Sequence, residues 1–514
     1  MNHSLSSRRW LLSILSAACM AGCTMEPHYQ RPELPISAQF PDAEDAGIAA
    51  SDIGWRDFFA DQRLRKLIEV ALAHNPDARV AALNIAAARA QYQIQRASLF
   101  PKISASATEQ IEKFPTAVAA VAGAGASGGA PAATAGGSGV SRYFDVGVGF
   151  TSYELDVFGR IRSLSHAKLE QYLGYVETRR STEISVVSEV ASAYLTLLAD
   201  EELLKITADT LKSQQESFDL IKRSFDGGVA TALDYHQAES TVATAEASLA
   251  QYTRQVAQDR NALAVLIGMP VPDDLPEGAD LNEQKLLAEL PAGVPSLVLT
   301  QRPDVRAAEH NLIAGNANIG AARAAFFPTI TLTGNYGTAS TTLSGLFDHG
   351  STAWTFSPQI NLPIFAGGAN VAALKLSKVQ RDILVAQYQQ SVQAAFREVA
   401  DALVARRPLD AQLSADQTLV NATGESLRLS QMRFDNGVDN YLTVLDSERS
   451  FFSAQQSLVN LKLARLQNQV TLYKALGGGW REYTAPSRPT GTLIDPHDKP
   501  TADHLVGRIN VSDR

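Results

Sequence analysis

The sequence predicts an α+β protein that is built from two similar halves and is much longer than a compact domain. Three observations support this prediction. Ordered landmarks recur at nearly constant spacing, very long helical stretches lack proline, and short stretches alternate apolar with polar residues. Only 19% of the 514 residues are charged, which excludes a highly charged disordered chain.

The N-terminus has the pattern of a secretory signal. The basic pair Arg8-Arg9 precedes an apolar run that is too short to span a bilayer as a mature helix. Residues 20–23 read Met-Ala-Gly-Cys, an arrangement that resembles the processing site of bacterial lipoproteins. We therefore expect residues 1–22 to be removed and Cys23 to carry lipid; the alternative is an ordinary signal with a fortuitous cysteine. Thr24, in place of an Asp, favours the outer membrane over the inner one.

Charge and cysteine count exclude several classes of function. The formal net charge is -9, so we expect no basic face for a nucleic-acid partner. Both cysteines, Cys19 and Cys23, precede the body of the protein, which therefore has no disulfide and no sulfur metal site. The histidines are scattered, and the sequence contains no HExxH, Walker or GxSxG motif. We predict no enzyme, no metal and no cofactor, and we interpret His166, His236 and His310 as packed or solvated residues.

The chain matches itself at ordered landmarks. One helical run, 76–101, begins with Pro-Asp and ends with Phe-Pro. A second run, 303–328, has the same two ends at an offset of 303 − 76 = 227 residues. Segment 225–229, Phe-Asp-Gly-Gly-Val, matches 434–438, Phe-Asp-Asn-Gly-Val, at 434 − 225 = 209 residues. Such agreement predicts a tandem repeat of one unit, in which a helix, two strands, a long helix and another helix follow one another.

These landmarks divide the chain. We expect a signal peptide at 1–22, an N-terminal periplasmic segment at 23–60, a first repeat at 61–270, a linker at 271–300, a second repeat at 301–480 and a C-terminal tail at 481–514. The strands are expected at about 102–112, 143–155, 328–338 and 353–363, and the tips of the helical hairpins at about 226–232 and 435–441.

The strand candidates alternate with period two, which gives each strand one apolar and one polar face. Ile330 and Leu332 alternate with threonines, and Trp354 and Phe356 alternate with Thr355 and a serine. A pair of soluble hairpins would give the same pattern, but the N-terminal signal for the outer membrane favours membrane strands. Even small barrels need about eight strands, so several chains must contribute, and three copies would supply about twelve. We expect no transmembrane helix after the signal.

The helices are too long for a compact domain. Residues 159–225 contain no proline, and at about 1.5 Å per residue they would span roughly 100 Å. Their apolar residues recur in steps of three and four, which we interpret as packing stripes. Gly227-Gly228 and Asn436-Gly437 lie between successive long helices, where a positive φ allows the chain to reverse. Each half therefore ends in an antiparallel hairpin whose tip lies far from the strands.

With these features the chain resembles the TolC-like outer-membrane factors, in the lipoprotein branch that includes OprM and NodT. The resemblance covers nearly all of the mature chain, and its most specific motifs are Gly-Val-Asp-Asn-Tyr-Leu-Thr-Val-Leu-Asp-Ser-Glu-Arg at 437–449 and the segment 472–480. It implies a homotrimer in which four strands per chain form a twelve-strand outer-membrane β-barrel. The barrel would continue into a long periplasmic α-helical barrel of coiled-coil hairpins. Segments outside strands and hairpins, including 405–415, would surround the tunnel.

The family implies the exit duct of a tripartite efflux system. Such a duct passively conducts drugs or other toxic small molecules to the exterior, from an inner-membrane RND-type pump and a periplasmic adaptor (a membrane fusion protein). Ducts for type I protein secretion or metal export are the alternatives, although few soft ligands remain in the mature chain for copper or silver. A coiled-coil adaptor or adhesin without a pore is a third reading, and it would show no conductance.

The resemblance also implies a periplasmic gate at the second hairpin tip. Leu442 would form an apolar ring and Asp446 an acidic ring where three copies meet on the axis, with Arg433 and Arg449 beside them. The alternative is a plain exposed pair of Asp446 and Arg449 at i and i+3, which contributes less than about 1 kcal/mol. Many relatives carry Tyr where this chain has Phe434, so one hydrogen bond of the usual gate is missing.

Overall fold

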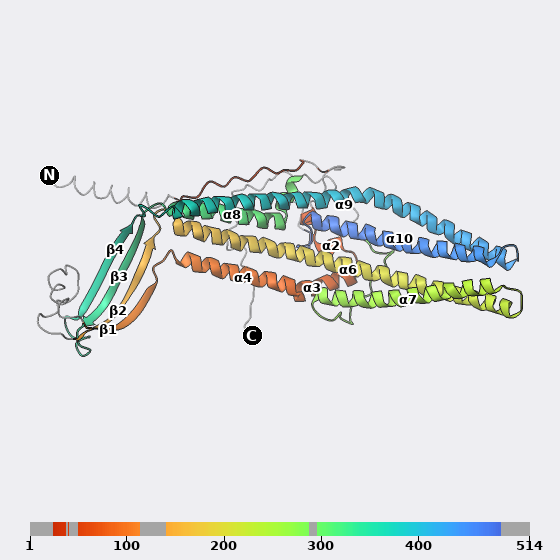
Figure 1. Ribbon diagram of the computed structural model, residues 1–514, viewed down its shortest axis with the longest axis horizontal. Coiled ribbons are helices and arrows are strands. Elements are labelled where there is room, and N and C mark those ends of the chain that lie inside the picture. Colours follow the sequence, from red (N-terminus) through yellow and green to blue (C-terminus); the bar gives the residue numbers. More distant parts are fainter. Residues whose placement is uncertain (1–23, 38–39, 41–49, 114–139, 287–295, 485–514) are drawn as a thin grey trace.

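The computed structural model describes residues 24–37, 40, 50–113, 140–286 and 296–484. The molecule is long and narrow, with a small sheet at one end and two helical hairpins at the other (Figure 1). The signal peptide, Cys23 and the C-terminal residues from 485 lie outside the described residues.

The sheet has four antiparallel strands in the order β1-β2-β3-β4. Their bounds are Ile103–Lys113 (β1), Val140–Leu155 (β2), Thr329–Ser340 (β3) and Thr352–Asn361 (β4). β2 begins three residues before the expected position and β3 ends two residues after it. Because β2 pairs with β3, the two halves of the chain are joined at the centre of the sheet, while β1 and β4 each keep one open edge.

Helices precede and follow each pair of strands. They are α3 (Gln62–His74), α4 (Pro76–Ala97), α6 (Arg160–Asp226), α7 (Ala232–Ile267), α8 (Pro303–Ala324), α9 (Ala369–Asp435) and α10 (Tyr441–Ala475), with the short α2 (Trp55–Phe58), η1 (Ala50–Asp52) and η2 (Ser296–Gln301). The order α4-β1-β2-α6-α7 thus recurs as α8-β3-β4-α9-α10. Both α6 and α9 contain 67 residues, so each extends for roughly 100 Å.

Local sequence fixes where several helices begin. The Asn75 side chain caps α4 by accepting hydrogen bonds from the backbone N–H groups of Asp77 and Ala78. Gly159 and Gly368, with φ of 74° and 84°, turn the chain from a strand into α6 and into α9 respectively.

The expectation that residues 405–415 lie outside the hairpins is wrong, because they belong to the continuous helix α9. Pro408 stands inside this helix, where it removes one backbone hydrogen bond without ending the helix. The absence of a proline was therefore not a condition for a long helix in this chain. Figure 1 shows α9 bending in its second half.

One stretch of α6 is long and apolar enough to cross a membrane by length and composition, contrary to expectation. However, 56% of that stretch is buried inside the molecule, and the core helix of a soluble protein passes the same test. Since α6 packs against α4, α7, α8 and α10, we interpret the stretch as part of the helical core.

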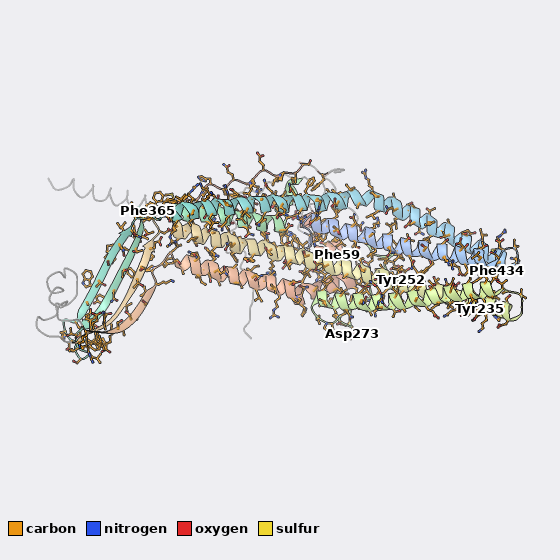
Figure 2. All side chains as sticks on the ribbon, viewed as in Figure 1. Phe59, Tyr235, Tyr252, Asp273, Phe365 and Phe434 are labelled. Carbon is orange, nitrogen blue, oxygen red and sulfur yellow. The ribbon has the colours of Figure 1, made fainter. Side chains whose placement is uncertain are left out.

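The main hydrophobic core lies at mid-length, where α2 and α3 pack against the long helices. The ring of Phe58 stacks on that of Tyr473 with 3.9 Å between centroids, and Phe59, labelled in Figure 2, is fully buried beside them. The Tyr473 hydroxyl donates a hydrogen bond to the backbone oxygen of Ile53 at 2.7 Å. This core ties the N-terminal elements to the end of α10 and leaves the hairpins to project beyond it.

Candidate functional site

The two hairpin tips use the same backbone turn. At the α6/α7 tip, Gly228 has φ of 76° and its N–H donates to Phe225 O at 2.9 Å. At the α9/α10 tip, Gly437 has φ of 68° and its N–H donates to Phe434 O at 2.8 Å. In each turn the next valine N–H reaches back five residues, which completes a Schellman motif. Glycine is required at Gly228 and Gly437 because other residues rarely adopt this φ.

Within the predicted Gly227-Gly228 turn, only Gly228 has a positive φ. The φ of Gly227, −81°, lies in the helical region, where any L-residue fits. Gly227 therefore only ends α6, and Gly228 alone makes the left-handed turn.

Polar caps start the returning helices. Thr231 and Asp234 form a reciprocal capping box at the start of α7. The Asn440 side chain accepts a hydrogen bond from the backbone N–H of Thr443 at the start of α10. The tips are thus well-defined turns.

A small hydrophobic cluster joins the two hairpins near their tips. Its buried members come from α6, α7 and α10: Ile221, Ala238, Tyr441, Val444 and Leu445. The ring of Phe434 lies 5.5 Å from that of Tyr441, and Phe225 lies 5.3 Å from Tyr235. Figure 2 labels Tyr235 and Phe434 at the same end of the molecule. Phe434 therefore packs within its own hairpin, in a half-buried position.

The three predicted gate residues of α10 share one exposed face. Leu442 is 47% exposed, and Asp446 and Arg449 are also exposed, whereas Val444 and Leu445 between them are buried. Positions 442, 446 and 449 fall on one side of a helix because they are spaced by four and three residues. Among the described residues no ion pair joins Asp446 to Arg449, so the plain surface pair is not formed in the single chain.

Arg433 has a partner that the sequence analysis missed. Its guanidinium binds the Asp439 carboxylate with two hydrogen bonds, of 2.6 and 2.9 Å. The hydrogen bond from Arg433 lowers the pKa of Asp439 below its ordinary value. This pair, here called the tip latch, joins the end of α9 to the loop before α10 and does not reach another hairpin. Only the folded turn brings the two residues together.

Glu448 is a second residue that the sequence analysis missed. It is 7% exposed and lies on the buried face of α10 with Tyr441 and Leu445. Burial raises the pKa of this carboxyl above its ordinary value. Its spacing from Tyr441 and Leu445, seven and three residues, was the signal that could have placed it on the apolar face.

The residues that follow Cys23 are fastened to the helices near the sheet. In this N-terminal strap, residues 24–36, Arg31 forms a bidentate ion pair with Glu309 of α8, at 2.7 and 2.9 Å. The Tyr29 hydroxyl also donates to Glu309, at 2.9 Å. The strap therefore runs from the predicted lipid site to the helical body.

A chain of ion pairs extends this attachment into α6. His166 Nδ1 lies 3.0 Å from Glu26 Oε2, and His310 Nδ1 lies 2.7 Å from Glu170 Oε2. Hydrogen bonds with Glu170 and Glu26 raise the pKa of His166 to about 10. Burial raises the pKa of Glu170, but the hydrogen bonds from His166 and His310 outweigh it and lower that pKa to about 2. These histidines are thus partners of carboxylates, while His236 pairs with Glu239 at the surface.

Within the part of the chain that the structure describes, no group of three or more His, Cys, Asp or Glu side chains is arranged to hold a metal ion. His166 of α6 contacts Glu26 and Glu170, and His310 of α8 contacts Glu170.

The family described as "Outer membrane efflux protein" matches residues 67–269 and 294–478. The chain is 46% identical over 493 residues to the toluene efflux pump outer membrane protein TtgC and to the antibiotic efflux pump outer membrane protein ArpC, both of Pseudomonas putida. Each match covers 95% of this chain and 99% of the relative.

A solved structure has the same fold. It is the crystal structure of the open state of the Neisseria gonorrhoeae MtrE outer membrane channel, which is 40% identical to this chain with a TM-score of 0.81. The match covers 90% of this chain and 100% of that one.

Proposed function

This chain belongs to the outer membrane efflux protein family, and from that premise we propose that it forms the exit duct of a tripartite efflux system. It lies in the outer membrane, with a large helical part in the periplasm. The observation that carries the proposal is the placement of a small sheet with two open edges and two helical hairpins at opposite ends of one chain. The sheet would supply strands to a membrane barrel, and the hairpins would supply helices to a periplasmic tunnel.

Three copies would complete the duct. The open edges of β1 and β4 must be paired within a membrane, because lipid offers no hydrogen bonds. β1 follows α4 on one side of the molecule, and β4 leads into α9 on the other (Figure 1). α4 and α9 both expose large apolar side chains, among them Leu83 and Ile94 on α4 and Leu376 and Ile383 on α9. One edge of each copy can therefore pack on the other edge of the next, which closes a ring of twelve strands.

The proposed cargo is drugs, solvents and other toxic small molecules. Relatives that are 46% identical are named for toluene and for antibiotics, which supports a duct that passes unlike compounds. We propose that an inner-membrane RND-type pump selects and drives the cargo, and that a periplasmic adaptor contacts the hairpin tips. The duct itself would be a passive conduit and would perform no catalysis.

We further propose that the second hairpin tips close the duct. Three copies would bring Leu442 and Asp446 to the axis, where leucines resist wetting and carboxylates attract cations. Both side chains are exposed in the single chain, which leaves them available for this role. Lipid on Cys23 would hold each copy to the outer membrane through the N-terminal strap, whose ion pairs support such a role.

The test is the susceptibility of a bacterial strain that lacks only this protein. We expect hypersensitivity to chemically unrelated drugs, dyes and solvents, with raised intracellular accumulation and restoration by the wild-type gene. Loss of one secreted polypeptide, or sensitivity to metal salts alone, would keep the duct and reject the proposed cargo.

A further inference from the structure

One oxygen of the buried Glu448 carboxyl has no hydrogen-bond partner among the described residues. This atom, Oε2, is enclosed by protein. A buried polar group without a partner is costly, usually by about 1–3 kcal/mol or more when charged. Because Oε2 is enclosed by protein, an occupant of the cavity would meet the rest of the Glu448 carboxyl, which lines the cavity wall.

Glu448 lines a cavity of about 190 Å³ between α6, α9 and α10. Asp209 and Thr210 of α6 form part of its wall, and Phe451 and Phe452 of α10 form another part. Asp209 is exposed, so it marks the side of the cavity that opens to solvent, whereas Glu448 lies at the enclosed side. The cavity lies beside the tip cluster and on a different face of α10 from Asp446, which is exposed.

The lining selects the charge of an occupant. It holds two carboxyl groups, hydroxyl and amide groups, and two aromatic rings, and none of its nine described residues is basic. A carboxylate in a poorly solvated site favours a cation that can donate hydrogen bonds, and aromatic rings attract cations and apolar groups alike. The volume equals that of roughly six water molecules at about 30 Å³ each, which suits a small organic molecule and is too small for a large drug.

We propose that this cavity binds a small organic amine, whose ammonium pairs with the Glu448 carboxylate while its apolar part packs against Phe451 and Phe452. The amine would bridge α10 to α6, because Glu448 comes from one helix and Asp209 from the other. A bound amine therefore stabilises the packing of the two hairpins against each other. This inference concerns a site on the chain itself and does not depend on the cargo of the duct.

The test uses the full-length protein in detergent, with benzylamine as the probe and benzyl alcohol as its neutral counterpart. Calorimetric titration is expected to show saturable binding of benzylamine and no comparable binding of benzyl alcohol. Glu448→Gln keeps the shape of the side chain but removes the charge, and is expected to weaken benzylamine binding by about tenfold or more. Glu216→Gln changes an exposed carboxylate of α6 that does not line the cavity, and should leave the affinity unchanged.

Two further variants keep the test decisive. Asp209→Asn changes an exposed residue, so it should fold even if Glu448→Gln does not, and it is expected to weaken binding by a few-fold. Asp446→Asn should have no effect on benzylamine binding. The proposal is overturned if wild-type protein shows no saturable binding, if benzyl alcohol binds equally well, or if both cavity variants retain the wild-type affinity. If Asp446→Asn alone loses binding, the amine binds at the gate and not in the cavity, which also overturns the proposal.

Discussion

The two hairpin tips share a backbone but differ in charge. With the offset of 209 residues, Leu233 of the first tip corresponds to Leu442 of the second, and both are exposed. The latch residues Arg433 and Asp439 correspond to Ser224 and Ala230, which cannot form an ion pair. The first tip thus keeps the turn and the exposed leucine but lacks the ionic contact.

The difference continues along the returning helices. Asp446 and Arg449 of α10 correspond to the uncharged Gln237 and Ser240 of α7, so a charged ring at these two positions could form only from the second hairpin. Turn geometry is therefore common to both tips, whereas the proposed ionic gate belongs to the second tip alone.

The largest expected effect is on the candidate charged ring. Replacing Asp446 and Arg449 with Ala should raise the resting conductance in planar bilayers by roughly tenfold, because the charges that narrow the closed end are removed. The matched double variant Gln237→Ala with Ser240→Ala should keep the wild-type conductance. Equal conductance in all three proteins would remove Asp446 and Arg449 from the gate.

The tip latch should have a smaller effect. Arg433→Ala should raise resting conductance by roughly two- to threefold, since the latch is solvent-exposed and fixes only its own loop. Ser224→Ala at the first tip is the control and should change nothing. An effect of Arg433→Ala as large as that of the Asp446 and Arg449 double variant would mean that Arg433 contacts more than Asp439.

Replacing a turn glycine with alanine should destabilise a tip only where the φ of that glycine is positive. Gly228→Ala and Gly437→Ala should each destabilise their tip by about 1 kcal/mol, because alanine is strained at a positive φ. Gly227→Ala should cost nothing or stabilise slightly, since its φ is helical. Hydrogen exchange of the tip amides measures each change, and equal loss of protection in Gly227→Ala and Gly228→Ala would contradict the turn assignment.

The attachment of the N-terminal strap should respond to pH through His166. The pKa of His166 is raised from 6.5 to about 10, so its contribution is complete below pH 6.5 and is lost as pH rises toward 10. The pKa of Glu170 is lowered from 4.5 to about 2, so its contribution is complete above pH 4.5 and is lost as pH falls toward 2. The attachment of the strap through His166 should therefore weaken as pH rises above about 6.5, whereas the Glu170 contacts, which join α6 to α8, should weaken as pH falls below about 4.5.

A spin label on Ser37→Cys reports this attachment, because Ser37 is exposed and directly follows the strap. Its mobility should increase above pH 6.5, and the additional change His166→Gln should abolish that dependence. A label whose mobility is constant from pH 5 to pH 10 would show that the His166 ion pairs do not hold the strap.

Periodicity and length predicted most of what the backbone does. Alternation at Ile330 and Leu332 marked a strand, and the glycine-containing segments marked both hairpin turns. Proline was a weaker guide, because Pro408 lies inside α9. A single proline costs one hydrogen bond, and a helix with extensive packing along its length can tolerate that loss.

Side-chain partners in the site were harder to predict. Arg433 and Asp439 are six residues apart, a spacing that no regular helix brings together, so only the Schellman turn makes their contact. The contact of His166 with Glu26 spans 140 residues, and no local pattern indicates it. Glu448 had helical spacing from buried neighbours, but a glutamate is normally expected at the surface.

The most direct test of a duct that closes at the second tips is a single cysteine at Leu442. The body of the mature protein has no other cysteine beyond Cys23, so Leu442→Cys can be oxidised selectively in cells. If three copies meet at this residue, oxidation should cross-link copies and raise drug accumulation, and a reductant should reverse both effects, whereas Leu233→Cys should show neither. Failure of Leu442→Cys to cross-link, or cross-linking that leaves drug accumulation unchanged, would contradict the account.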